Sequence, residues 1–182
     1  MIIAEGVELR ELRPGDAAGL AAALTRSREH MAPYEPVRPP EFYTERGQAE
    51  RIEGLLAERD GGRMRPFVLA DTATGLPVGT INLGSIVHGP LCSGGVGYWV
   101  DVDRAGRGLA TAAVEEVCRI ARDEVGLHRV EAGTTTYNTA SQRVLAKCGF
   151  VRYGTAPKYL HVNGAWRDHH LFQRLLHDAD PS

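Results

Sequence analysis

A glycine-rich stretch just before an amphipathic segment is the clearest place for chemistry in this sequence. Gly106 and Gly108 lie at the start of a helical apolar pattern that spans residues 107–125. A helix N-terminus carries unpaired N–H groups and about half a positive charge, and glycine lets an anion come close to the backbone. The spacing therefore indicates a pyrophosphate site, although a plain helix start that contains glycine explains the same residues.

The same glycines invite comparison with the fingerprint of dinucleotide-binding folds. Gly106, Gly108 and Thr111 approximate its spacing, and Glu131 follows Gly108 by 23 residues, near the position of a ribose-binding acid. The third glycine is missing, however, and roughly four or five residues separate the preceding strand from the glycines, where the fingerprint wants an immediate turn. The chain that remains is also too short for a second mononucleotide-binding half, so we disfavour a nicotinamide cofactor.

A second polar pair stands at the start of a short apolar pattern. Asn138 is a good helix cap, and Ser141 shares a helical face with Leu145 and Cys148 before Gly149 ends the pattern. Taken alone, these residues are a helix cap and a small residue tolerated in the first turn.

The elements that position these residues follow from apolar periodicity and turn chemistry. Helices are predicted over 16–28, 44–59 and 107–125, with a short helix after Asn138. Strands are predicted over 7–12, 67–70, 78–87, 95–102, 127–134, 150–159 and 166–175. Residues 31–40 contain four prolines and are predicted to be irregular, whereas Asn163 and Gly164 are the strongest hairpin signal. Glu115 and Arg119 are expected to pair on the polar face of the long helix.

Length and composition exclude several classes of protein. The chain has 182 residues, 43% of them hydrophobic, which suits one mixed α/β domain, expected over 1–176 with a frayed tail over 177–182. The 21 basic and 23 acidic residues give a net charge of −2, which argues against a nucleic-acid binder. No apolar run approaches the ~18 residues of a membrane span, and residues 1–5 do not form a signal peptide, so we expect a cytoplasmic protein.

The cysteines and histidines do not suggest a metal site. Cys92, Cys118 and Cys148 lack metal-ligand spacing, and we expect buried thiols. His169 and His170 are adjacent in a predicted strand and point to opposite faces, so they cannot chelate one ion together. We predict no metal.

Five motifs follow one another in a fixed order over residues 97–168, within a resemblance that extends over residues 7–175. They are GYWV at 97–100, RGLAT at 107–111, Asn138 with Ser141, KCGF at 147–150, and NGAWRD at 163–168. In this order and spacing they closely resemble the GNAT N-acetyltransferases, and within them the branch that acetylates the N-termini of ribosomal proteins, the RimJ/RimL type. The resemblance implies the GNAT fold, a strongly bent mixed sheet with helices on both faces, and acetyl-CoA as cosubstrate.

The resemblance also implies a cofactor site. The pyrophosphate would be held by main-chain N–H groups of Ala105, Gly106, Arg107, Gly108, Leu109, Ala110 and Thr111. The pantetheine arm would bind Val100, Asp101 and Val102 like an added strand, with help from Asn138, between the splayed strands 95–102 and 127–134. Ala105 departs from the Gln or Arg common in the family at that place, and Arg104 or Arg107 could supply the countercharge.

For the chemistry, the resemblance implies direct attack of a primary amine on the acetyl group in a ternary complex. Ser141 would be the catalytic residue, as a stabiliser or relay for the departing thiolate, and main-chain N–H groups at a strand bulge would stabilise the carbonyl oxygen. An acyl-cysteine route through Cys148 is disfavoured because that residue belongs to an apolar helix face.

The base and the acceptor are less defined. No carboxylate occurs in 93–97 or 155–166, which leaves five candidates for the base: Glu131, Glu35, Tyr98, His161 through water, and solvent itself. Peptide α-amines have a pKa of ~7.7–8.0 against ~10.4 for lysine and need little help, so a weak base favours a protein N-terminus as acceptor. A polyamine, antibiotic or amino-acid acetyltransferase and a non-catalytic acetyl-CoA sensor are the alternatives, and residues 30–43 would decide between acceptors. The resemblance also suggests a homodimer.

Overall fold

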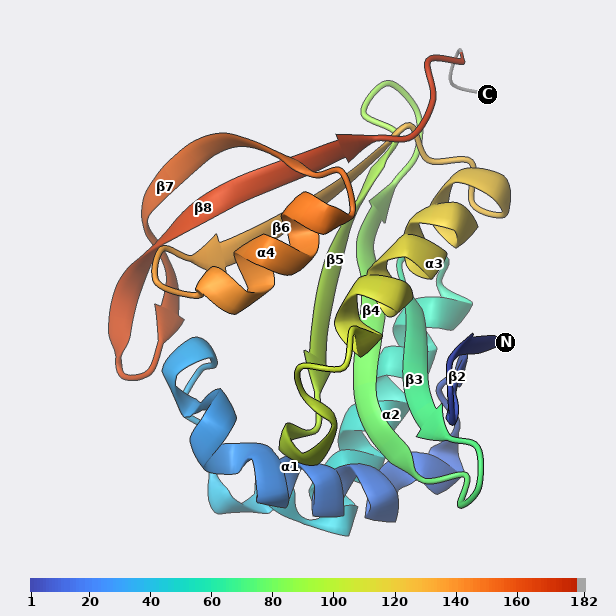
Figure 1. Cartoon of the computed structure of the whole chain (residues 1–182), viewed down its shortest axis with the longest axis vertical. Helices are drawn as coiled ribbons and strands as arrows, with labels where there is room; N and C mark the ends of the chain where they lie inside the picture. The colour runs from blue at the N-terminus through green and yellow to red at the C-terminus, as the bar shows by residue number, and fades with distance from the viewer. Residues whose placement is uncertain (180–182) are drawn as a thin grey trace.

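The computed structural model describes residues 1–179, in which one open eight-stranded sheet carries helices on both faces (Figure 1). The strand order is β1-β2-β3-β4-β5-β6-β8-β7, and every neighbouring pair is antiparallel except β5 with β6. The strands are β1 (Ile2–Ala4), β2 (Val7–Glu11), β3 (Arg65–Asp71), β4 (Pro77–Val87), β5 (Ser93–Val100), β6 (Arg129–Thr135), β7 (Val151–Val162) and β8 (Ala165–Leu175). The α-helices are α1 (Ala17–Met31), α2 (Glu45–Asp60), α3 (Leu109–Asp123) and α4 (Thr139–Lys147). The predicted mixed α/β fold is confirmed.

Two apolar clusters hold the helices on opposite faces of the sheet. Strand β3 alternates between them, because Phe67 and Leu69 pack with α3 and α4 whereas Val68 and Ala70 pack with α1 and α2. Burial of both faces explains why β3 reads as a continuous apolar run.

Strands β5 and β6 pair over a short distance and then part. Their parallel register covers Ser93 with Arg129, Gly94 with Val130 and Gly95 with Glu131, although β5 continues to Val100 and β6 to Thr135. A Cβ at Gly94 would lie 3.0 Å from a methyl carbon of both Leu83 and Leu127, so glycine permits the close packing at this junction. Beyond Gly95 the two strands leave a gap in the hydrogen-bonded sheet.

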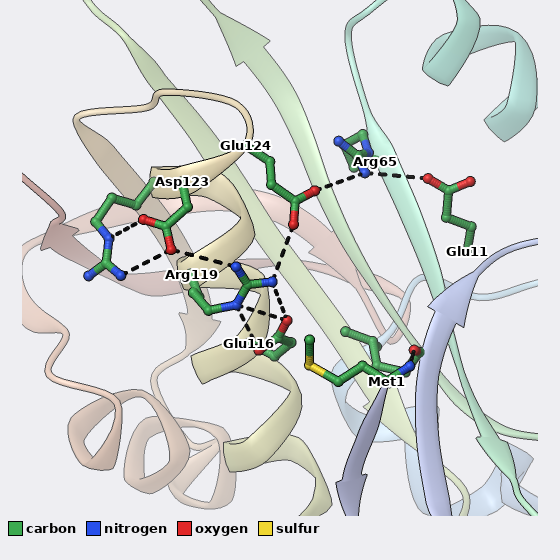
Figure 2. Close-up of polar contacts among 9 residues, drawn as sticks. Met1, Glu11, Arg65, Glu116, Arg119, Asp123 and Glu124 are labelled. Atoms are coloured by element: carbon green, nitrogen blue, oxygen red, sulfur yellow. Dashed lines mark hydrogen bonds and ion pairs between the residues drawn. The ribbon is translucent and has the colours of Figure 1, made fainter.

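The polar face of α3 carries ion pairs that differ from the predicted one (Figure 2). Arg119 pairs with three acidic residues, Glu116 at 2.7 Å, Glu124 at 3.2 Å and Asp123 at 3.5 Å. Glu124 also contacts Arg65 of β3, which links the end of the helix to the sheet. The predicted Glu115–Arg119 pair is wrong, because Glu115 instead binds Arg174 of β8 at 2.8 Å. Each pair is partly exposed and contributes little to stability, so α3 is held on the sheet mainly by its buried apolar face.

Several boundaries also differ from the sequence-based ones. Strand β1 was not predicted, and α1 continues to Met31. The four-proline segment is not wholly irregular, since it contains the 3-10 turn Ala32–Tyr34 and begins a second one, Pro40–Tyr43. The strand predicted over 95–102 ends at Val100, and the helix predicted over 107–125 begins at Leu109. The hairpin at Asn163 and Gly164 is confirmed, with φ of 47° and 73° at the two turn residues.

The end of the described chain is partly anchored. His177, the first residue of the segment expected to fray, packs its ring against that of His128, with 5.9 Å between ring centroids. Residues 180–182 of that segment lie outside the described residues. None of the helices in 1–179 combines the length and the hydropathy that crossing a membrane requires.

Candidate functional site

The turn between β5 and α3 is built on Asp101, whose side chain is almost fully buried. Its carboxylate accepts hydrogen bonds from the N–H of Asp103 at 3.2 Å and from Arg26 of α1 at 2.5 Å. It thereby caps the 3-10 turn Val102–Arg104 and ties this turn to α1. This buried carboxylate therefore fixes the turn that leads into the two glycines.

The start of α3 presents a row of free N–H groups. The first main-chain bond of this helix runs from the N–H of Ala112 to the carbonyl of Gly108 at 3.0 Å. Within residues 1–179, no acceptor contacts the N–H groups of Gly106, Arg107, Gly108, Leu109, Ala110 and Thr111. Gly106 and Gly108 adopt φ of 75° and 78°, and a Cβ at either would meet nothing within 4 Å. Glycine is therefore needed for backbone conformation, and the space beside these N–H groups is open.

Ala105, Arg104 and Arg107 differ from these free N–H groups because each already donates a hydrogen bond within the protein. The N–H of Ala105 is already donated to the carbonyl of Val102 at 3.3 Å, so the expectation that it would bind an anion is wrong for this group. Arg104 binds Asp71 at 2.5 Å, whereas the exposed Arg107 donates to the carbonyl of Asp103. Arg107 is thus the better placed of the two arginines expected to supply a countercharge.

The main-chain groups of β5 that are free to bind a ligand are not all at the expected residues, Val100, Asp101 and Val102. The N–H of Asp101 is donated to the carbonyl of Val78 at 2.9 Å, and that of Val102 to Oγ of Ser27 at 3.1 Å. These two N–H groups are therefore already bonded within the protein and are not free for the added strand that was expected at Val100, Asp101 and Val102. Because hydrogen bonding alternates along an antiparallel strand, the main-chain groups of Tyr98 and Val100 face away from β4, towards the gap. Of the three residues predicted to bind the pantetheine arm, Val100 therefore still has free main-chain groups. Tyr98, which was not predicted, has them as well.

A hydrogen-bonded pair of hydroxyls connects β5 with α4. Oη of Tyr98 lies 2.8 Å from Oγ of Ser141, and the N–H of Ser141 is donated to Oδ1 of Asn138 at 3.1 Å. The predicted cap is confirmed. Burial raises the pKa of Tyr98 to about 12, so its hydroxyl is neutral at physiological pH. The sequence indicated Ser141 but not its pairing with Tyr98.

The other candidates for a base lie in different surroundings. Glu131 binds Arg129 at 2.5 Å and accepts a hydrogen bond from Tyr153 at 3.1 Å. His161 is exposed and packs edge-on against Trp166. Burial raises the pKa of Glu35, which nearby arginines partly oppose. Glu131 and Tyr98 are therefore poor bases, because one is ion-paired and the other stays protonated.

The cysteines are buried, as predicted. Burial raises the pKa of Cys118 to about 11 and that of Cys148 to about 12, so neither forms a thiolate near neutral pH. Within the described residues, no group of three or more His, Cys, Asp or Glu side chains is arranged to hold a metal ion.

The segment after α1, residues 32–43, contacts the elements that carry the site. Tyr137, in the turn between β6 and α4, donates its hydroxyl to the carbonyl of Pro33 at 2.8 Å. The N–H of Asn163, at the tip of the β7–β8 hairpin, is donated to the carbonyl of Glu35 at 2.9 Å. Residues of α1, of this segment and of the hairpin tip line a partly open cavity of about 130 Å³.

Comparisons with known proteins agree with this geometry. A family model described as an acetyltransferase (GNAT) domain matches residues 7–151. A probable N-acetyltransferase of Bacillus subtilis, YjcK, is 31% identical over 180 residues, which cover 99% of each chain. The crystal structure of a ribosomal-protein-S5-alanine acetyltransferase from Vibrio fischeri superposes with a TM-score of 0.92 at 34% identity, covering 98% of this chain and 97% of the other. The structure of RimJ from Mycobacterium smegmatis in complex with CoA-disulfide superposes with a TM-score of 0.88 at 38% identity. The match covers 93% of this chain and 81% of the other.

The fold also separates this chain from the dinucleotide-binding alternative. That fold needs a mostly parallel sheet, whereas β5 with β6 is the one parallel pair among the strands described for 1–179. Parted strands, a glycine turn with free N–H groups and a family match over most of the chain point the same way. The chain belongs to the GNAT acetyltransferase family.

Proposed function

We propose that this chain transfers the acetyl group of acetyl-CoA to the N-terminal α-amine of a protein, of the ribosomal-protein type. The similar structure from Vibrio fischeri bears the name of this activity, and the one from Mycobacterium smegmatis is named RimJ and holds a CoA-disulfide; both support the proposal. The observation that carries it is the row of six free N–H groups from Gly106 to Thr111, beside a gap between two parted strands.

The chain's own groups fit the parts of acetyl-CoA. The diphosphate would accept hydrogen bonds from the N–H groups of Gly106, Arg107, Gly108, Leu109, Ala110 and Thr111, with the guanidinium of Arg107 as countercharge. The amide-containing arm would bind the main-chain groups of Val100 and Tyr98 in the gap, as an added strand does. Asn138 uses Oδ1 for its cap and keeps its side-chain N–H groups for the same arm.

The residues around Ser141 would act on the leaving group. When acetyl-CoA is bound, it supplies a thioester carbonyl; the amine nitrogen forms a bond to this carbon, and the carbon–sulfur bond breaks. Ser141 would donate a hydrogen bond to the departing thiolate, while Tyr98 donates to Ser141 and holds its orientation. Of the two N–H groups of β5 that face the gap, that of Val100 would bind the arm and that of Tyr98 would stabilise the carbonyl oxygen. The amine loses its proton to water, because an α-amine with a pKa of ~7.7–8.0 is partly neutral at pH 7.5.

A thiol-release assay with two acceptor panels tests the proposal. We expect peptides with a free N-terminus to be acetylated and the same peptides with a blocked N-terminus to be inert. Faster turnover of polyamines or other small amines would contradict the proposed acceptor. Saturable binding of acetyl-CoA without turnover of any amine would identify a sensor instead of an enzyme.

A further inference from the structure

Three charged side chains gather around Phe42, between α1, α2 and the segment after α1. They are Glu35, Arg38 and Arg51. The guanidinium carbon of Arg38 lies 4.7 Å from the centre of the Phe42 ring, and that of Arg51 lies 5.8 Å from it. Within residues 1–179, none of the three side chains takes part in a hydrogen bond or an ion pair within 4.0 Å, and Nε of Arg38 is buried without a partner. Buried polar groups are almost always satisfied, so this cluster is unusual.

The cluster has an excess of positive charge in partly buried surroundings. Two guanidinium groups face one carboxylate, and burial, followed by the charge of Arg38, lowers the pKa of Arg51. Removing a charge from water without a partner is unfavourable, and an added anion would offset that cost. The cluster therefore carries one uncompensated positive charge, which a bound anion would neutralise.

The cavity of about 130 Å³ gives such a group access. Glu35, Arg38 and Phe42 line it, together with Met31 of α1 and Asn163 of the hairpin. The same segment contacts the turn before α4 through Pro33 and Tyr137. Figure 1 shows the C-terminal end of α1 and the tip of the β7–β8 hairpin close together, next to the open end of the gap between β5 and β6. A chain that places its N-terminus in the gap can thus extend towards this cavity.

We infer that the cavity selects acceptor polypeptides that carry an acidic side chain a few residues after their N-terminus, with its carboxylate bound between Arg38 and Arg51. In this complex the Glu35 carboxylate would accept a hydrogen bond from a main-chain N–H of the bound peptide. A peptide offers both the carboxylate and the N–H donor, whereas two guanidinium groups repel a polyamine. The inference rests on the proposed transfer to a protein N-terminus and adds the sequence that is preferred.

Paired peptides test this preference directly. Each pair differs only by Glu or Gln at one of the positions two to five, and kcat/KM is measured for the wild type and for Arg38→Gln, Arg51→Gln and Arg46→Gln. We expect a preference for Glu of about tenfold or more at one position, because a lost charged hydrogen bond has an effect of this size. Arg38→Gln, in the cavity wall, and Arg51→Gln, beside it on the ring of Phe42, should both abolish the preference while turnover of the Gln peptide changes little. Arg46, an exposed arginine on the same helix as Arg51, is the matched control and should retain it.

The outcomes separate this inference from the proposed function. Equal kcat/KM for Glu and Gln at all four positions refutes the inference and leaves the function intact. Equal losses on both peptides in Arg38→Gln and Arg51→Gln, with unchanged thermal unfolding, also refute it, because they show a role without selectivity. If no peptide is turned over, the proposed function fails. Binding of a fluorescently labelled Glu and Gln pair to the protein with CoA then decides the inference, and equal affinities overturn it.

Discussion

The phenolic oxygen of Tyr98 lies 2.8 Å from the hydroxyl oxygen of Ser141, and this contact joins the parted strand β5 to the first turn of α4. Both hydroxyls carry a proton, so either can be the donor; in the orientation in which Tyr98 donates, the Ser141 proton is free to point elsewhere. Mutation can separate the two proposed roles: Ser141 would contact the leaving group, and Tyr98 would orient Ser141.

Ser141→Ala should lower kcat by about 10- to 100-fold, which corresponds to one charged hydrogen bond in the transition state. KM for acetyl-CoA should change little. Tyr98→Phe keeps the ring and should lower kcat less, by a few fold. Steady-state kinetics measure both, with Thr139→Ala, an exposed residue of the same helix, as control. A Ser141→Ala variant with full kcat would remove this residue from the proposed mechanism.

Gly108→Ala should weaken CoA binding by about tenfold or more and destabilise the fold by about 1–2 kcal/mol, because an L-residue is strained at φ of 78°. Gly126→Ala is a matched control: Gly126 has φ of 75° at the other end of α3 and equally open surroundings. It should show the same loss of stability and unchanged CoA affinity by calorimetry. Equal CoA affinities in the two variants would argue against the diphosphate site.

CoA and acetyl-CoA should raise the melting temperature, whereas nicotinamide cofactors should not. At 100 times its dissociation constant a ligand adds ~2.7 kcal/mol to the free energy of unfolding, which is a shift of roughly 5–10 °C for a chain of this size. Differential scanning fluorimetry measures it. A shift with NAD and none with CoA would reverse the assignment of the glycine turn.

Asp101→Asn should lower the free energy of unfolding by about 1–3 kcal/mol. Its partner Arg26 is half exposed, which keeps the loss below that of a fully buried pair. Since the carboxylate also caps the turn before Gly106, CoA affinity should fall as well. Asp103→Asn, at an exposed carboxylate 3.6 Å from Arg26, should change both quantities little. Urea unfolding and calorimetry compare the two variants.

The rate should depend on pH through the acceptor and not through Tyr98. For an N-terminal peptide, kcat/KM should rise with pH and level off above the amine pKa of ~7.7–8.0, because the neutral amine is the nucleophile. The pKa of Tyr98, raised to about 12, lies outside this range, so Tyr98→Phe should leave the midpoint unchanged. A midpoint that moves in this variant would mean that Tyr98 titrates as the base.

Local patterns predicted most of the fold because the strongest signals lie within one element. Helix α3 and the β7–β8 hairpin follow from apolar spacing and an Asn-Gly turn, and Asn138 was correctly predicted as a cap. Strand β1 was missed because three residues carry no periodicity. The pairing of Glu115 with Arg174 was missed because it depends on how α3 lies across β8.

The site was less predictable for the same reason. Ser27, which occupies the N–H of Val102, comes from a helix 75 residues earlier in the chain. Arg38 and Arg51 were not singled out, and their sequence signal is weak: Arg38 lies between Pro36 and Pro39 in a segment that reads as a plain linker. Residues that meet across elements can be found only once the packing is known.

The pairing of β5 with β6 ends at Gly95 and Glu131, and this makes it possible to observe whether a ligand fills the gap beyond them. In the free protein the amides of Tyr98 and Val100 face an interruption of the sheet and should exchange their hydrogens with water rapidly. A molecule that fills the interruption would slow this exchange at these two positions, while amides of Trp99 and Asp101, already bonded to β4, would change less. Residue-resolved deuterium uptake could therefore detect the bound state without any turnover.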